Sequence, residues 1–500
     1  MSLPLVSPAP RRVQVAAAAG WALVGGLIGM YLVVFALSAF GRLTRPYEEF
    51  AYGESWLLDD ARRVAAGEPL YAPVDRLPLT HTAYTPVYYV LVGHLQRVLG
   101  DTGYSLGRAV SLAGALAAAG CLSCAVRRLT QSWLAAALAA GLFLTQNLTV
   151  LLWAPLHRVD ALALAFTLCG LALATAGRHG SAAAVFLLAI LTKQTFLVGP
   201  AAVCLALWPC WREIARFGAI LVGALLAAVV VGQALTNGWF LWHTVLANSN
   251  QAELQTFSQL MGSFMQFNGL PVLAATASLA LPATCRQERI WRWYLLGSVA
   301  TLPSVAKIGA SSNYWLEISA ATAALLAVAS YRLSRCPQAR LVAPVMVAGA
   351  LLISIPGYQA NAREALDSMR EVIWPSAPAY LSLVSDVSYA PMRVETGFVR
   401  NVAAEPGELL TDNPGLAVAA GKRIAYEFQI FQLLYVEGRW SQAPILSAIA
   451  QRRFSLVALM HPLDGPTLGT RWTTSIRDAL LATYAPAGQQ SGFWLYRPTP

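Results

Sequence analysis

The most constraining feature of this chain is a series of apolar stretches too long for the core of a soluble domain. They include Val13–Phe40, Leu106–Val126, Ile220–Leu235 and Leu341–Ile355. Each approaches or reaches the roughly 20 apolar residues that a helix needs to cross the hydrocarbon layer of a bilayer. Composition agrees, because 57% of the 500 residues are hydrophobic and 12% are charged, against about 25% charged residues in soluble domains. The sequence therefore predicts a polytopic membrane protein built from helices.

Basic residues between the apolar runs predict which loops face the cytoplasm, because cytoplasmic loops are rich in Lys and Arg. Six clusters alternate with turns that carry almost no charge: Arg11/Arg12, Arg127/Arg128, Arg178, Arg212/Arg216, Arg286/Arg289/Arg292 and Arg332/Arg335/Arg340. Eleven spans fit between them, at about 16–40, 105–126, 132–151, 159–177, 181–197, 198–211, 217–236, 269–285, 293–308, 314–333 and 341–356. The N-terminus is then cytoplasmic. The net charge of +10 reflects this rim and does not indicate a nucleic-acid partner.

Three segments are expected on the outer side of the membrane. The loop 41–104 is acidic in its early part, with a short helix over 57–66 and an amphipathic stretch over 86–99. A second loop, 237–268, is polar. Residues 357–500 have an ordinary globular composition, with expected strands at 408–411, 454–460 and 492–496 and expected helices at 414–420, 428–437 and 443–452. This alternation predicts a small α/β domain after a membrane domain that covers residues 1–356.

A few ionisable residues border or interrupt the apolar runs, and with this topology they meet on the outer side. Arg158 and Asp160 lie where the third span turns into the fourth, and Lys193 ends the fifth. Lys307 lies in the turn before the tenth span, and Glu317 follows it. Charge at membrane depth is costly, so such residues are candidates for a functional site. A brace between Arg158 and Asp160, or between Arg158 and a first-loop Glu, is the structural alternative.

This combination of charges suits the transfer of a group onto a hydroxyl. A carboxylate can take the proton of the acceptor, while Lys or Arg neutralises a phosphate leaving group. Lys193, Arg158 and Lys307 are therefore the candidates for binding a donor phosphate. The supporting residues of the candidate site are Asp160, Tyr84, Asn313, Tyr314 and Glu317.

The order and spacing of five short motifs resemble the GT-C glycosyltransferases. These motifs are Gly67–Tyr71, Tyr84–Tyr89, His157–Ala163, Leu191–Thr195 and Gly309–Tyr314. The chain is most similar to the bacterial branch that includes protein O-mannosyltransferases and lipid A aminoarabinose transferases (glycosyltransferase family 39-like).

The resemblance implies an inverting transfer of a sugar from a polyprenyl-phosphate donor to a hydroxyl of a glycan, lipid or protein. The reaction would take place at the outer face of the bacterial cytoplasmic membrane, with the C-terminal domain periplasmic or extracellular. No cofactor is certain. Some members of the class use a divalent metal, but no spacing of Asp, Glu and His here resembles a complete metal site.

In such enzymes an acidic residue of the first outer loop is the general base. Counting back from Gly67 by the spacing typical of the family leads to Glu54, but Gly53 replaces the acidic residue that the family often has before it. The true acidic pair, Glu48-Glu49, lies earlier in the loop and remains the alternative. Asp59 and Asp60 are the remaining candidates for the base, and a solvated helix face is the preferred interpretation for them.

Two other classes of function fit the same composition. A polytopic transporter or flippase of lipid-linked substrates would also bury cations among many spans, but it would more often show repeated halves with broken helices. No such repeat is apparent in the sequence. A non-catalytic membrane assembly protein with an outer domain is the other alternative.

Overall fold

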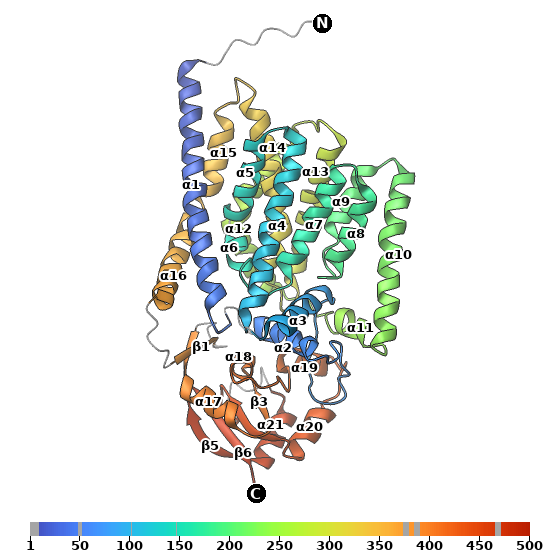
Figure 1. Cartoon of the computed structure of the whole chain (residues 1–500), viewed down its shortest axis with the longest axis vertical. Coiled ribbons are helices and arrows are strands. Elements are labelled where there is room, and N and C mark those ends of the chain that lie inside the picture. Colours follow the sequence, from blue (N-terminus) through green and yellow to red (C-terminus); the bar gives the residue numbers. More distant parts are fainter. Residues whose placement is uncertain are drawn as a thin grey trace.

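The apolar runs form a helical bundle at one end of the molecule, and the C-terminal residues form a separate domain at the other end (Figure 1). The first helix begins at the end of the bundle that lies away from this domain (Figure 1). The computed structural model describes residues 10–48, 53–101, 103–146, 148–373, 380–384, 391–465 and 472–500.

Each predicted span corresponds to a helix or a pair of helices. The bundle consists of α1 (Arg11–Thr44), α4 (Tyr104–Thr130), α5 (Trp133–Thr145), α6 (Leu148–Trp153), α7 (Asp160–Thr175), α8 (His179–Ile190), α9 (Val198–Leu207), α10 (Trp211–Leu235), α12 (Leu254–Ala277), α13 (Arg286–Ala300), α14 (Leu316–Ser334), α15 (Val342–Leu352) and α16 (Ile355–Ile373). Four of the described helices are long and apolar enough to cross a membrane, and α15 with α16, bent by 50°, would make a fifth.

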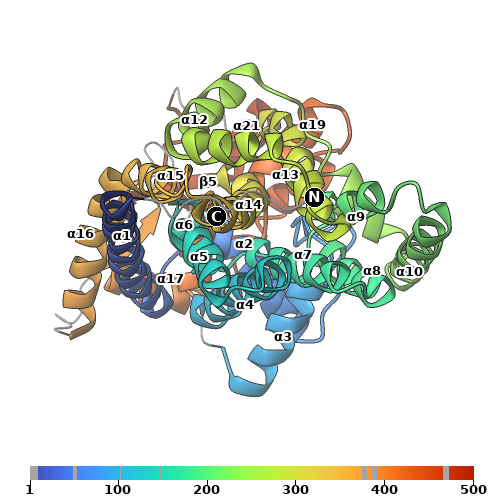
Figure 2. The same ribbon diagram turned by 90° about the horizontal axis from the view of Figure 1, so that it is seen from above.

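Two helices of the bundle have opposite environments. α14 lies in the middle of the bundle (Figure 2). Its buried residues include the small Ala320, Ala321 and Ala324. Small residues let helix backbones approach closely inside a membrane. α10 lies at the periphery (Figure 2), and only its Phe217 and Leu221 are buried. An apolar helix with so little protein contact is suited to contact with lipid.

The first and last spans pack side by side, although they are far apart in the sequence (Figures 1 and 2). The rings of Tyr31 in α1 and Tyr358 in α16 stack with their centroids 3.9 Å apart. The Tyr31 hydroxyl donates a hydrogen bond to the Leu351 carbonyl at 3.0 Å. This buried contact closes one side of the bundle.

Several predictions about helix boundaries are wrong; α8, for example, was expected to reach residue 197 but ends at Ile190. The second outer loop was expected to extend to residue 268, but α12 already begins at Leu254 and contains Pro271. Its Gln, Ser and Asn residues lower the hydropathy of this segment, so its sequence resembles that of a polar loop. The last span was expected to end at residue 356, whereas helix α16 continues to Ile373.

The first outer loop forms a layer between the bundle and the C-terminal domain. Its helices are α2 (Gly53–Ala65) and α3 (Val87–Leu99), and both lie at this end of the bundle (Figure 1). The second outer loop adds α11 (Trp239–Leu241) and a π-helical turn, Trp242–Leu246. α2 begins four residues before the expected helix 57–66, which places Glu54 in its first turn.

The C-terminal domain is a mixed sheet with helices, as expected. Its four-stranded sheet has the order β3-β4-β6-β5, with β3 and β4 parallel and the other pairs antiparallel. The strands are β3 (Glu408–Thr411), β4 (Phe454–Leu459), β5 (Tyr484–Gln490) and β6 (Phe493–Pro498), and a separate antiparallel pair comprises β1 (Tyr380–Val384) and β2 (Pro391–Glu395). The helices are α17 (Thr396–Ala404), α18 (Pro414–Ala419), α19 (Phe428–Val436), α20 (Ala443–Ala450) and α21 (Thr474–Thr483).

The sequence did not predict β1, β2, β5, α17 or α21. β5 is an edge strand that contains Pro486 and Gly488, and most of its residues are exposed. It therefore lacks the alternation of apolar and polar residues that identifies a strand. The domain is docked on the first outer loop. Leu58 of α2 and Tyr104 belong to the same buried cluster as Leu416 of α18.

Candidate functional site

Asp160, at the start of α7, is the centre of a buried group of charges. Its Oδ1 accepts hydrogen bonds from Lys193 Nζ at 2.6 Å and from Asn313 Nδ2 at 2.8 Å. Its Oδ2 lies 3.5 Å from Arg158 Nε. We call Asp160, Lys193, Arg158 and Asn313 the Asp160 centre. It brings together three turns at the end of the bundle that faces the C-terminal domain, because Arg158 precedes α7, Lys193 follows α8 and Asn313 precedes α14.

Aromatic rings surround the two cations of this centre. The Tyr84 hydroxyl accepts a hydrogen bond from Arg158 Nη2 at 2.7 Å. The Tyr84 ring centroid lies 5.5 Å from the Arg158 guanidinium carbon and 5.7 Å from Lys193 Nζ. Tyr314 lies on another side of Lys193, with its ring centroid 5.0 Å from Nζ. Cations over aromatic faces are stabilised electrostatically, most strongly when they are desolvated.

The Asp160 centre carries more positive than negative charge. Lys193 and Arg158 contribute two cations and Asp160 one anion, so the net charge is +1 when all three are ionised. Asp160 Oδ2 and Arg158 Nε are buried and have no hydrogen-bond partner among the described residues. Buried polar atoms normally have partners, and the exceptions call for an explanation such as a ligand.

Lys307 and Glu317 lie nearby in the sequence but outside this network. Lys307 is half-buried in the turn that leads to Asn313, and its ammonium has no ion pair in the described parts of the chain. Glu317 is in the first turn of α14 and likewise forms no ion pair within the described ranges. The structure therefore joins five of the expected residues, namely Arg158, Asp160, Lys193, Tyr84 and Asn313, and places Tyr314 against them.

A second buried charge pair lies beside the first. Glu54 in α2 accepts hydrogen bonds from Arg108 Nε at 2.8 Å and from Arg108 Nη2 at 2.7 Å. The remaining donors of Arg108 reach the carbonyls of Arg42, Arg45 and Tyr47 at 2.6–2.9 Å. Both side chains are fully buried. We call Glu54 and Arg108 the Glu54 centre.

The two centres are linked through adjacent residues. The His157 N–H donates to Glu54 Oε1 at 2.7 Å. Arg158 Nη1 donates to the Gly53 carbonyl at 2.9 Å. Hydrogen bonds thus connect Glu54 directly to the turn that carries Arg158.

The other first-loop carboxylates are placed differently. Glu48 is buried, and its Oε2 accepts hydrogen bonds from the Ser55 N–H and the Ser55 hydroxyl. Glu49 lies outside the described residues. The expectation that Asp59 and Asp60 form a solvated helix face is wrong, because the two residues are only 3% and 4% exposed.

The two aspartates are buried because the C-terminal domain and the rest of the first loop cover this face of α2. Asp60 accepts hydrogen bonds from Arg63 at 3.1 Å and from the Thr82 hydroxyl at 3.0 Å. Burial raises the pKa of Asp60 to about 7, although Arg63 opposes the shift. Burial also raises the pKa of Asp59, against the charge of Arg423.

Sequence reasoning missed Arg108. The signal was a single Arg inside the apolar run Leu106–Val126, where a charge without a partner is costly. Nothing in the local sequence identifies its partner, because Glu54 lies 54 residues earlier.

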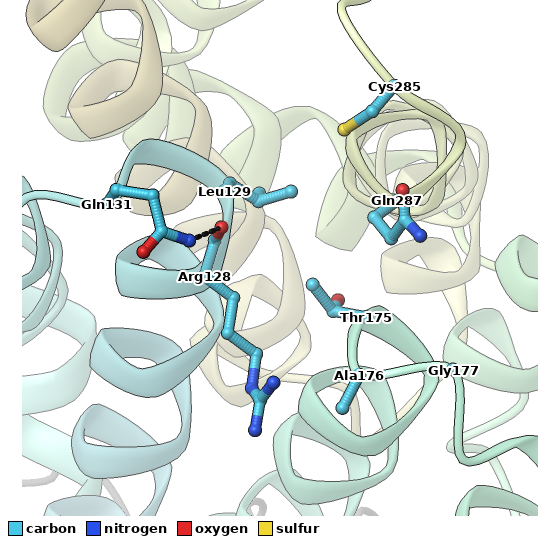
Figure 3. Close-up of a pocket in the computed structure, with 8 residues that line it drawn as sticks. All are labelled: Arg128, Leu129, Gln131, Thr175, Ala176, Gly177, Cys285 and Gln287. Atoms are coloured by element: carbon cyan, nitrogen blue, oxygen red, sulfur yellow. Dashed lines mark hydrogen bonds between the residues drawn. The ribbon is translucent and has the colours of Figure 1, made fainter.

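Two cavities of the fold lie away from these centres. One, of about 300 Å³, lies where α4 and α7 end and α13 begins, and its lining includes Arg128, Gln131 and Gln287 (Figure 3). The other, of about 400 Å³, lies between the first outer loop and the C-terminal domain, with Glu68, Arg423 and Arg453 in its wall. Within the described ranges, no group of three or more His, Cys, Asp or Glu side chains could hold a metal ion.

Comparison with known proteins identifies the fold of this chain. No family model and no curated protein matches the sequence. Two crystal structures of ArnT from Cupriavidus metallidurans are similar to this chain, one bound to undecaprenyl phosphate and one in the apo state. They share 14% and 15% of residues with it, each with a TM-score of 0.61 over 96% of this chain and 98% of ArnT. At the level of the fold, the expected resemblance to GT-C enzymes is confirmed.

Proposed function

We propose that this protein, which shares the fold of ArnT, transfers a sugar from a polyprenyl-phosphate donor to an acceptor hydroxyl. The reaction takes place at the face of the membrane that carries the C-terminal domain. The observation that supports this most strongly is the Asp160 centre, a buried group with a net positive charge and polar atoms left without hydrogen-bond partners. The ArnT structure bound to undecaprenyl phosphate makes a lipid phosphate the ligand to test first.

The charge of the Asp160 centre fits the charge change of such a reaction. The acceptor oxygen bonds to the anomeric carbon while the bond from that carbon to the phosphate oxygen breaks. The phosphate changes from a diester with one negative charge to a monoester with up to two. Lys193 and Arg158 then bind the phosphate more strongly as its charge develops, and interactions that strengthen in the transition state accelerate a reaction. Lys307 supplies a third cation from the neighbouring turn.

The proton of the acceptor hydroxyl goes to Glu54. Glu54 forms an ion pair with Arg108 at 2.7 Å, and a positioned carboxylate can accept a proton. Its Oε1 is linked through the His157 N–H to the turn that carries Arg158. The acceptor must replace one of the existing hydrogen bonds to Glu54. Glu48 and Glu49 remain the rival bases.

The supporting residues set the geometry of the donor site. Tyr84 and Tyr314 place aromatic faces against Lys193, and Asn313 holds Asp160 Oδ1. Asp160 keeps both cations in position without cancelling their combined charge. Glu317 lies at the edge of this group. No step is assigned to a metal.

The proposed location is the bacterial cytoplasmic membrane, with the N-terminus in the cytoplasm and the C-terminal domain outside. The acceptor is a hydroxyl of a glycan, a lipid or a protein. An alkaline phosphatase reporter fused after Pro500 should be active, since that enzyme needs an oxidising compartment. A fusion that is active only as a cytoplasmic reporter contradicts this orientation.

The function is tested with purified full-length protein and a panel of labelled polyprenyl-phosphate sugars. We expect one donor to lose its sugar to an added acceptor, and we expect Lys193→Met to weaken binding of undecaprenyl phosphate. Wild-type protein that neither binds the lipid phosphate nor transfers any sugar refutes the proposal. Movement of labelled lipid across vesicles without transfer would favour a flippase instead.

A further inference from the structure

A short segment of the first outer loop, residues 79–84, extends from the C-terminal domain to the Asp160 centre. At its beginning it forms an isolated parallel β-bridge with that domain, between Leu79 and Tyr426. The Leu79 N–H donates to the Ala425 carbonyl at 2.8 Å, and the Glu427 N–H donates to the Leu79 carbonyl at 2.9 Å. The His81 N–H donates to Glu427 Oε2 at 2.7 Å. These bonds fix the segment to the C-terminal domain.

The middle of segment 79–84 is held from the membrane side. The Thr82 N–H donates to His243 Nδ1 at 3.1 Å. The Ala83 carbonyl accepts from Asn248 Nδ2 at 2.6 Å and from Gln194 Nε2 at 2.9 Å. Gln194 directly follows Lys193, so this contact ties the segment to the turn that carries a cation of the Asp160 centre.

The far end of the segment supplies Tyr84 to the Asp160 centre. Its hydroxyl accepts from Arg158, and its ring lies against both Arg158 and Lys193. Its carbonyl accepts from the Tyr71 hydroxyl at 2.9 Å. The position of Tyr84 therefore depends on a segment anchored in the C-terminal domain.

Glu427 is an unusual anchor. It is 8% exposed, and its carboxyl makes one hydrogen bond in the described part of the chain, to the His81 N–H. Asp59, Asp60 and Arg63 are the charged groups close enough to influence it. Burying a carboxyl without an ion pair is costly, and a fold that needed only a docked domain could use an apolar residue here.

We propose that Glu427 is a positioning residue for the donor site. It acts through segment 79–84 and holds Tyr84 against Arg158 and Lys193. The C-terminal domain then helps to position a residue of the donor site. This inference rests on the proposed function, because it concerns how tightly the site binds a lipid phosphate.

The test compares Glu427→Ala with Glu427→Gln in the full-length protein, using undecaprenyl phosphate as the probe. The alanine variant should bind it about tenfold more weakly, because it loses the hydrogen bond that the His81 N–H donates to the Glu427 carboxyl and that fixes the segment. The glutamine variant should bind like the wild type, because its amide oxygen can still accept from His81. Glu408→Ala is the matched control, because Glu408 pairs with Arg453 elsewhere in the same domain.

A double variant separates positioning from general stability. If Glu427 acts through Tyr84, Glu427→Ala should weaken binding no further in a Tyr84→Ala background. An equal loss in both backgrounds, or no loss in either, overturns the proposal.

Hydrogen exchange at the His81 and Thr82 amides gives a readout that does not depend on lipid binding. It should be faster in Glu427→Ala and unchanged in Glu427→Gln. Wild-type protein that binds no lipid phosphate, while this exchange difference persists, refutes the proposed function but leaves the coupling in place. Lipid binding without an exchange difference refutes the positioning role alone.

Discussion

The Glu54 centre and the Asp160 centre are neighbours at the end of the bundle that faces the C-terminal domain, but their charges are balanced in opposite ways. Among the described residues, Glu54 pairs with Arg108, and the remaining donors of Arg108 reach three backbone carbonyls. In the Asp160 centre two cations share one anion, and Asp160 Oδ2 has no hydrogen-bond partner in the described structure. The first arrangement holds loops together, whereas the second has charge left for a ligand.

Because of this difference, the role of Glu54 as a general base needs a more direct test than the phosphate-binding role of the Asp160 centre. A buried carboxylate in a saturated ion pair stabilises the fold whether or not it also accepts a proton. A base for the acceptor hydroxyl must exchange one of its hydrogen bonds during the reaction. Variants of both centres test whether the Glu54 centre stabilises the fold while the Asp160 centre binds the ligand.

The largest effect is expected from Glu54→Gln. If Glu54 is the general base, turnover at saturating donor should fall by about 10²–10⁴-fold, with donor affinity retained. Glu48→Gln, at a rival base, should lose much less, because Glu48 accepts hydrogen bonds from Ser55. If Glu54→Gln turned over at the wild-type rate, the Glu54 centre would have a structural role alone.

Arg108→Met should be the most destabilising single change in either centre. It leaves Glu54 buried without its cation, and breaking a buried ion pair costs about 3–5 kcal/mol. Thermal unfolding in detergent would measure the loss, with Arg453→Met in an exposed pair as the control. Equal melting temperatures for these two variants would contradict the contrast between a saturated centre and an exposed pair.

Lys193→Met should affect ligand binding more than stability. Asp160 keeps Asn313 and Arg158 as neighbours in this variant, so the loss of stability should be smaller than for Arg108→Met. Removing one charge-assisted bond to phosphate should weaken donor binding by at least tenfold, from about 1.5–3 kcal/mol. Calorimetry with undecaprenyl phosphate would measure this. Unchanged affinity would assign Lys193 to structure alone.

The smallest effect concerns the pH dependence of stability. Burial raises the pKa of Asp60 to about 7 in the folded state, above the ordinary value of 3.8. The folded protein therefore holds this proton more tightly than the unfolded chain, and the stability that results is lost as pH rises from the lower value to the higher one. Asp60→Asn should flatten the fall in melting temperature over this range.

Part of the slope should remain in that variant, because burial also raises the pKa values of Glu427 and Asp59. Melting temperatures of both proteins, measured across this range, make the comparison. An unchanged slope in Asp60→Asn would mean that Asp60 does not titrate there.

The sequence was informative where a single physical constraint dominates. Long apolar runs and basic clusters predicted the order of the helices, and the cost of burying charge identified Arg158, Asp160 and Lys193 before any contact was known. These three meet because Arg158 and Asp160 lie at the start of α7 and Lys193 lies just after the end of α8. Their roles in a reaction remain predictions.

Prediction failed where the environment is made by distant segments. Asp59 and Asp60 look solvated in the sequence, and only the docking of the C-terminal domain on α2 buries them. Arg108 could be identified as costly, but its partners lie on α2 and at the end of α1. The polar beginning of α12 and the exposed strand β5 have the composition of loops, so tertiary contacts decide their structure.

The pairing of α1 with α15 and α16 has a consequence for biosynthesis. The bond from Tyr31 to Leu351 joins residues 320 positions apart, so the first helix enters the membrane long before its partner is made. At about 5–20 residues per second, the interval is roughly 15–60 s. A ribosome-arrested chain that ends before residue 341 should therefore leave Tyr31 open to cross-linking with lipid or with the insertion machinery. Protection of Tyr31 in that truncated chain would show that another partner shields the helix during synthesis.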